Sequence, residues 1–294
     1  MSSPASSAAR AAIRSTGRPG FRIGSVLVRV PLLVWSLVVI YPIFWMFLGA
    51  FKSNAEIFRS PWALPESFSF DNFARAWGEY GVGGGLLNSA LVTGLGTVLT
   101  LLVGLPAAYS IGRLKFPGAS VIYSVFVVSL SIPAVLGVIP LFFLMLDNGL
   151  LNNQAALSVV YAGTRIAFTI FLLCGFMHAV PAELEEAAAL DGLGRWQTLW
   201  RVVAPMMTPA LITVAVMNAV TFWNEYVLAL VLLPREEVRT IGVVLSYMSV
   251  NAQYTNDWGG LFAALSLSVI PVIVVYALLQ KQIVRGMVEG ALKD

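Results

Sequence analysis

The hydrophobic positions of this chain form long stretches rather than the short alternating runs that are typical of half-buried β-strands. A helix needs about 20 apolar residues to cross the hydrocarbon core of a bilayer, and six stretches reach that length with few or no charged side chains. They cover residues of about 28–51, 86–112, 119–146, 155–178, 206–233 and 258–281. The pattern therefore predicts an all-α integral membrane protein with six transmembrane helices.

The basic side chains indicate which ends of these helices face the cytoplasm. Six spans place both termini on one side of the membrane, and if that side is the cytoplasm, the inner segments carry twelve Lys and Arg residues and the outer segments five. Lys and Arg gather on the cytoplasmic side, so we expect both termini there. The chain then divides into a flexible N-terminal arm (1–24), a membrane domain (25–281) with a cytoplasmic loop (181–205), and a cytoplasmic C-terminal tail (282–294).

The composition agrees with lipid as the solvent and excludes several other classes of protein. Hydrophobic residues make up 58% of the chain and charged residues 11%, whereas soluble domains carry about 25% charged residues. The net charge of +3 forms no dense basic stripe, which excludes nucleic-acid binding. With one cysteine, Cys174, and one histidine, His178, the chain can build neither an internal disulfide framework nor a Cys/His metal cluster.

Small residues recur at regular spacing in the second predicted span. Gly96, Gly104 and Gly112 are eight residues apart, which places them near one face of a helix. Membrane helices approach one another closely where such small residues lie. We therefore expect this face to contact another helix, with a hinge as the less favoured alternative.

The longest polar stretch on the outer side, residues 52–85, is rich in tryptophan and phenylalanine. Aromatic side chains gather at the surface of a membrane. The segment is therefore interpreted either as an interfacial plug without a partner or as a docking surface, and composition alone favours neither.

Two polar residues in the fifth predicted span are candidates for a translocation pathway. Asn224 and Glu225 lie within an otherwise apolar stretch, where a carboxylate is costly unless it faces a cavity, a partner or a hydrogen-bond donor. They either line the path of a hydroxyl-rich solute or form a structural hydrogen bond to another helix. Arg165, in the fourth span, either pairs with Glu225 or extends towards the outer interface.

The cytoplasmic loop 181–205 has the signals of two short helices. Pro181 suits a helix start, three glutamates follow at the positive end of the helix, an alanine run favours continuation, and Gly192 suits the stop. Small side chains would allow a partner to approach closely. Propensity and charge alone nevertheless favour an interfacial hairpin without a partner.

The spacing of residues in this loop resembles a known signature. Glu186-Ala187-Ala188 is followed after three residues by Gly192, after nine more by Val202, and then by Ala204-Pro205. The pattern is similar to the EAA signature, EAA, x3, G, x9, I-x-L-P, of the membrane subunits of bacterial ABC importers, with Val and Ala in place of Ile and Leu. Three further segments, 51–58 followed by Asp71-Asn72-Phe73, 222–233 and 280–294, are similar to the shorter six-span permease of the maltose-type, carbohydrate-uptake branch.

The resemblance implies a type I ABC importer permease in the bacterial inner membrane. Its implied partners are a second homologous permease subunit, two ABC ATPase subunits, and an extracytoplasmic binding protein that delivers a sugar-like solute. ATP and Mg²⁺ would be bound by the ATPase subunits, with no cofactor in this chain, whose sequence contains no G-x-x-x-x-G-K-[ST]. The residues that the resemblance assigns to coupling with the ATPase are Glu186, Ala187, Ala188, Asp191, Gly192 and Pro205.

Three alternatives to a sugar importer remain open from the residues. An ion-coupled secondary transporter acting alone would need acidic residues near the midplane and often paired repeats, and the sequence offers one such acid and no repeat. An importer for a non-sugar solute, such as a glycerol phosphate or a polyol, fits the same motifs. An intramembrane protease has little support, because the sequence contains no H-E-x-x-H.

Overall fold

A computed structural model of the chain describes the backbone of residues 23–114 and 116–291, and the side chains of 29–114 and 116–280. All regular structure in these ranges is helical. The chain divides into two compact units, residues 1–46 and 47–294, and each is described by itself. The predicted N-terminal arm, 1–24, lies almost wholly outside the described residues, and of the predicted tail, 282–294, only the backbone as far as residue 291 is described.

Helix α1 (Ile23–Gly49) makes up the described part of the first unit and matches the first predicted span. Its side chains from residue 29 to residue 44 are exposed. A helix that is apolar on every side is typical of a membrane environment, so lipid or another chain accounts for these exposed surfaces. Two prolines, Pro31 and Pro42, lie inside the helix.

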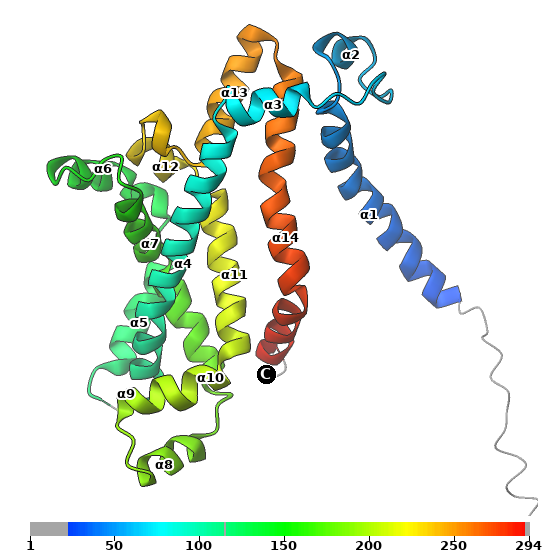
Figure 1. The fold of residues 1–294 in the computed structure, drawn as a ribbon. Helices are drawn as coiled ribbons and strands as arrows, with labels where there is room; N and C mark the ends of the chain where they lie inside the picture. The colour runs from blue at the N-terminus through cyan, green and yellow to red at the C-terminus, as the bar shows by residue number, and fades with distance from the viewer. Residues whose placement is uncertain (1–22, 115, 292–294) are drawn as a thin grey trace, which may run out of the picture. The chain divides into compact units, whose positions relative to one another are not determined.

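The second unit is built around four long helices, as Figure 1 shows. They are α4 (Val82–Arg113), α7 (Gln154–Met177), α11 (Thr208–Asn224) and α14 (Trp258–Ala291). Helix α4 packs along α7, and α11 packs against α4, α7 and α14. By length and apolar composition, α1, α4, α7 and most of α14 can each cross a membrane.

The glycine face of α4 is where it meets its neighbours, as its spacing predicts. A Cβ atom at Gly104 would lie 2.6 Å from the Cγ2 atom of Thr169 in α7. At Gly96 a Cβ atom would lie 3.3 Å from the ring of Phe222, and at Gly112 it would lie 3.8 Å from Cys174. The absence of side chains along this face therefore allows α4 to lie very close to α7.

The remaining predicted spans are broken helices. Helix α5 (Ala119–Ser129) and the segment formed by η2 (Ala134–Gly137) and α6 (Val138–Asp147) meet at an angle of 91°. A second bend, of 80°, separates residues 195–206 from α11. If each bent pair counts as one span, the described residues contain up to six spans, the number that the hydrophobic pattern predicts.

The fifth predicted span, 206–233, is not a single helix. Helix α11 ends at Asn224, and a separate short helix, α12 (Val227–Leu232), follows it. The carboxylate of Glu225 accepts hydrogen bonds from the backbone N–H groups of Leu228 (2.7 Å) and Ala229 (3.2 Å). The first N–H groups of a helix have no carbonyl acceptor within that helix. Glu225 supplies acceptors for two of them, so the chain ends one helix and begins the next at this residue.

The predicted outer segment 52–85 folds into short helices at the end of the bundle opposite α8, which Figure 1 shows. They are α2 (Asn54–Arg59) and α3 (Asp71–Gly78), and they lie near α13 (Ile241–Thr255) and the start of α14. Between α12 and α13 lies the short turn η4 (Glu236–Val238). Trp62 and Phe68 on this segment are exposed, which agrees with both the interfacial and the docking interpretation.

A polar cluster joins α3 to the turn before α14. The guanidinium of Arg75 lies 3.1 Å from a carboxylate oxygen of Asp257, and the hydroxyl of Tyr80 donates to the other oxygen at 2.7 Å. Burial by itself would raise the pKa of Asp257, but the hydrogen bonds from Tyr80 and Arg75 outweigh it and hold the pKa below its ordinary value of 3.8. The same contacts raise the pKa of Arg75 and of Tyr80.

We expect Asp257→Asn to lower the free energy of unfolding at pH 7 by about 1–2 kcal/mol, because charged hydrogen bonds are strong but Arg75 is partly exposed. The pKa of Asp257 is lowered by folding, so its contribution is present above the ordinary pKa and disappears as the pH falls through the lowered one. Thermal unfolding in detergent at pH 7 and pH 3 measures this as a destabilisation that shrinks in acid. Glu66→Gln, which breaks the exposed pair with Arg59, is the control and should change little. An equal destabilisation at both pH values would contradict the assignment.

Candidate functional site

The loop 181–205 folds into the two-part hairpin that its sequence predicts. Helix α8 (Ala182–Leu190) begins after Pro181 and carries acidic residues in its first turn. Gly192 has a φ of +79°, in the left-handed region. The N–H of Leu193 donates to the carbonyl of Ala188 (2.9 Å), and the N–H of Gly192 donates to that of Ala189 (3.0 Å). These two bonds form the Schellman arrangement that ends a helix at a left-handed residue.

The second half of the hairpin returns to the bundle through α9 (Arg195–Thr198), the π-helical turn η3 (Leu199–Val203) and α10 (Ala204–Met206). Leu199 and Val203 are fully buried and belong to the same core cluster as Met177 of α7. The hairpin is therefore anchored to the bundle by apolar packing on this side. Figure 1 shows α8, α9 and α10 together at one end of the long helices.

Helix α8 presents two different faces. Glu186 and Ala187 of the signature are exposed, and Leu190 is 90% exposed, one turn further along. Ala188 is only 4% exposed and faces the rest of its own chain. The exposed side of α8 therefore carries acidic, small and apolar side chains, whereas Ala188 and Glu185 on its other side contact the bundle.

The buried face of α8 holds an ion pair that the sequence interpretation did not assign. Oε1 of Glu185 lies 3.0 Å from Nε of Arg113 at the end of α4, and the hydroxyl of Tyr109 donates to Oε2 of Glu185 at 3.1 Å. Arg113 also donates to the carbonyls of Met177 (2.8 Å) and Val180 at the end of α7. The positive-inside pattern could have indicated this pair, because it places Arg113 and the acidic loop on the same side of the membrane.

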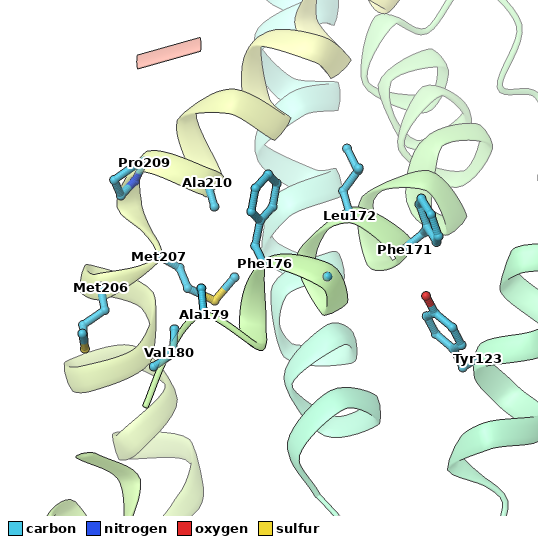
Figure 2. Close-up of a pocket in the computed structure, with 11 residues that line it drawn as sticks. Tyr123, Phe171, Leu172, Phe176, Ala179, Val180, Met206, Met207, Pro209 and Ala210 are labelled. Carbon is cyan, nitrogen blue, oxygen red and sulfur yellow. The ribbon is translucent and has the colours of Figure 1, made fainter. Parts of the chain in front are cut away.

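A cavity of about 390 Å³ lies beside the 80° bend that follows the hairpin. Figure 2 shows Met206, Met207 and Pro209 of the bend at one side of it and Tyr123 of α5 at the other. Its wall is mostly apolar, and a Cβ atom at Gly175 would meet nothing within 4 Å. Free space therefore adjoins the point where the hairpin joins α11.

A second cavity, of about 680 Å³, lies beside the break between α5 and η2 and the break between α11 and α12. The residues that line it come from α5, η2, α6, α7, α11 and α12, and Glu225, Thr164 and Thr221 are among its polar members. The hydroxyl of Tyr161 donates to Glu225 at 2.6 Å, and the ring of Tyr161 stacks on that of Phe222. A carboxylate and hydroxyl groups therefore lie in the wall of a space within the membrane domain.

Of the three polar residues that the sequence grouped in this region, Arg165 and Glu225 line this cavity and Asn224 does not. Asn224 is exposed, donates to the carbonyl of Val220 one turn earlier, and does not line the cavity. The Nε atom of Arg165 donates to Asn218 at 3.1 Å, and its guanidinium lies over the ring of Phe168. The pairing of Arg165 with Glu225, one of the two alternatives, is therefore wrong, because Glu225 is bonded to Tyr161 and to the start of α12.

The described residues include no group of three or more His, Cys, Asp or Glu side chains that could hold a metal ion. Cys174 is buried in the core between α4 and α7. His178 follows the last residue of α7 and is exposed.

Comparison with known proteins identifies the family. The sequence profile described as "Binding-protein-dependent transport system inner membrane component" matches residues 100–289. The chain is 34% identical over 89% of its length, and 87% of the relative, to the diacetylchitobiose uptake system permease protein NgcG of Streptomyces coelicolor. It is 34% identical over 96% of its length, and 93% of the relative, to the probable ABC transporter permease protein YurM of Bacillus subtilis.

A solved structure is also similar to the chain. It is the crystal structure of a bacterial ABC transporter involved in the import of the acidic polysaccharide alginate. The two share a TM-score of 0.77 and 30% sequence identity, over 88% of this chain and 96% of the matched chain.

The chain therefore belongs to the inner-membrane components of binding-protein-dependent transport systems, and to their carbohydrate-uptake type. It is a multi-pass inner-membrane permease subunit of a bacterial ABC importer, not itself an enzyme, and it works with an ATPase and a binding protein. This membership excludes the alternative of a secondary transporter acting alone.

We expect Gly192→Ala to weaken the corner of the hairpin, because an L side chain at this φ costs about 1–2 kcal/mol. That cost corresponds to roughly a 5–30-fold smaller population of the folded corner. Gly194→Ala is the matched control, since Gly194 has an ordinary φ of −71° and open space around it. ATP-driven uptake in reconstituted vesicles should fall for Gly192→Ala and stay near normal for Gly194→Ala, with similar melting temperatures. Equal uptake by both variants would show that the corner needs no left-handed residue.

Proposed function

We propose that this chain forms one half of the membrane pathway of an oligosaccharide importer, opposite a second homologous permease subunit. Two ATPase subunits bind beneath the pair, and ATP and Mg²⁺ are held there rather than in this chain. An extracytoplasmic binding protein delivers the solute from the outer side. The observation that carries the proposal is the two-faced helix α8, which is held to the bundle on one side and exposed on the other.

The exposed face of α8 is the surface that seats in an ATPase subunit. Glu186, Ala187 and Leu190 form its accessible side, and the small alanine allows close approach of a partner. Asp191 is exposed at the end of the helix, next to the corner at Gly192. Ala188, although part of the signature, serves the packing of the hairpin on its own chain.

The bend after the hairpin allows this surface to move relative to the membrane helices. Pro205 and Pro209 lie on either side of Met207, where the chain turns by 80°. Each proline lies in the first turn of its helix, where the missing N–H costs no helical hydrogen bond, so one helix ends and another begins here and the chain can change direction. Closure of the ATPase pair on ATP shifts the hairpin, and the shift changes which side of the membrane the pathway faces.

The cavity beside Glu225 is the part of the pathway that this chain contributes. Its volume of about 680 Å³ lies within the range of roughly 300–1,000 Å³ that small-molecule sites occupy. Glu225 can accept hydrogen bonds from solute hydroxyl groups, and Thr164 and Thr221 add hydroxyls of their own. Asn224 lies outside this wall, so the proposal assigns the pathway role to Glu225 alone of the two.

The nature of the relatives supports an oligosaccharide as the solute. The relative NgcG belongs to an uptake system for diacetylchitobiose, and the similar solved structure belongs to a transporter of alginate. Both solutes consist of linked sugar rings, and both present many hydroxyl groups to a protein. A polar cavity wall interrupted by aromatic and aliphatic side chains suits such molecules.

The assembly is tested by purifying the tagged chain in mild detergent and identifying the subunits that remain bound. We expect a homologous permease, an ABC ATPase in two copies, and, after reconstitution in vesicles with a binding protein, ATP-dependent uptake of an oligosaccharide. Mutating the Walker A lysine of the ATPase should abolish uptake and serves as the control. Uptake that continues without an ATPase, or a preparation that never retains one, would overturn the proposal.

The pathway role is tested with Glu225→Gln. This change keeps the size of the side chain and an oxygen that accepts from the start of α12, but removes the charge and one acceptor oxygen. We expect a rise in the apparent KM for uptake of roughly 3–10-fold, as for loss of one or two hydrogen bonds to the solute. Asn224→Ala is the neighbouring control and should leave the KM unchanged. An unchanged KM for Glu225→Gln, with normal folding, would remove Glu225 from the pathway.

A further inference from the structure

A movement of α8 can drive transport only if it is transmitted to the membrane helices. Two connections are available in the described part of the chain. One is covalent and runs through α9, η3 and α10 into α11. The other is the polar contact between Glu185 of α8 and Arg113 of α4.

The contact at Glu185 joins three elements at one point. Oε1 of Glu185 forms an ion pair with Nε of Arg113 at 3.0 Å, without hydrogen-bond geometry, and Oε2 accepts a hydrogen bond from the hydroxyl of Tyr109 at 3.1 Å, so the carboxylate contacts two residues of α4. Arg113 donates in addition to the carbonyls of Met177, the last residue of α7, and of Val180, in the turn that follows it. The side chains of Arg113 and Glu185 are only 18% and 19% exposed, so water screens the pair weakly.

The helices behind this contact are packed tightly together. Gly104 of α4 lies so close to Thr169 of α7 that a Cβ atom would clash, and Gly112, the residue directly before Arg113, lies near Cys174. A displacement of Arg113 is therefore imposed on α4 and α7 together, because close-packed interiors transmit strain rather than absorb it.

The covalent connection is softer. It passes through the π-helical turn η3 and the 80° bend at Met207, where α10 ends and a new helix, α11, begins with Pro209 in its first turn. The cavity of about 390 Å³ beside the bend, seen in Figure 2, leaves space for the chain to shift. A push on α8 is therefore taken up at this bend before it moves α11.

We propose that the Glu185–Arg113 pair is the joint through which the hairpin moves the membrane helices, with Glu185 and Arg113 as positioning residues for coupling. The inference rests on the proposed function, in which the exposed face of α8 seats in an ATPase subunit. Loss of the joint leaves that face unchanged, since Glu186, Ala187 and Leu190 point away from it. ATP hydrolysis then continues, but less of it is converted into movement of the solute.

The test uses the full assembly in vesicles and measures solute taken up per ATP hydrolysed. We expect Glu185→Gln and Arg113→Met each to lower this ratio by roughly 5-fold or more, while the amount of co-purified ATPase stays unchanged. The double variant should be no worse than either single variant, because both remove the same interaction. Arg113→Lys, which keeps the charge, should recover much of the ratio. Asp147→Asn is the matched control, since Asp147 is an exposed carboxylate outside α8 and both cavities and has no ion pair among the described residues.

Each failure points to a different conclusion. If the unmodified assembly retains no ATPase or imports nothing, the proposed function is wrong. If the unmodified assembly works and the single variants keep a normal ratio, or if their losses add in the double variant, the joint is wrong. Loss of bound ATPase in Glu185→Gln or Arg113→Lys would also overturn the joint, because Glu185 would then act in docking rather than in transmission.

Discussion

The close contact between α4 and α7 is the constraint on which the rest of the membrane domain depends. In lipid, apolar surfaces gain little from meeting one another, so helices associate where small residues allow the backbones to approach. Gly104 meets the methyl group of Thr169, and Gly96 leaves room for the ring of Phe222. The core around Leu105, Leu173 and Val214 is built on this contact. The other helices and the hairpin then pack against a pair that is already fixed.

Breaks in the helices are the second organising feature, and polar side chains stabilise them. A helix end leaves backbone groups without partners, which is costly away from water. Glu225 accepts from the start of α12, Asn54 accepts from the first N–H groups of α14, and Arg113 donates to the last carbonyls of α7. The same side chains face a cavity or tie elements together. The same few polar residues therefore bond the free backbone groups at helix ends and take part in the proposed function.

The features that the sequence predicted correctly are those that depend on neighbouring residues. The alanine run and Gly192 predict α8 and its end, and the chain adopts both, with Gly192 at a positive φ. The spacing of Gly96, Gly104 and Gly112 predicts a contact face, and that face is in contact. The mostly apolar run 206–233, with Asn224 and Glu225 inside it, predicts one helix, and this is wrong, because the carboxylate of Glu225 reaches forward to two backbone N–H groups. Hydrophobicity along the chain carries no information about such a bond.

By itself, the sequence predicted six membrane spans and the place of the two-helix hairpin at 181–205, because these follow from composition, periodicity and local spacing. The similarity of the hairpin to the EAA signature indicated the family. Only the tertiary structure decided that Glu185 rather than Glu186 binds the bundle, that Ala188 faces inward, and that Glu225 pairs with Tyr161 while Arg165 pairs with Asn218. The reason is that each of these partners lies on another helix, and the rotation of one helix against another is set by packing between residues that are far apart in the chain.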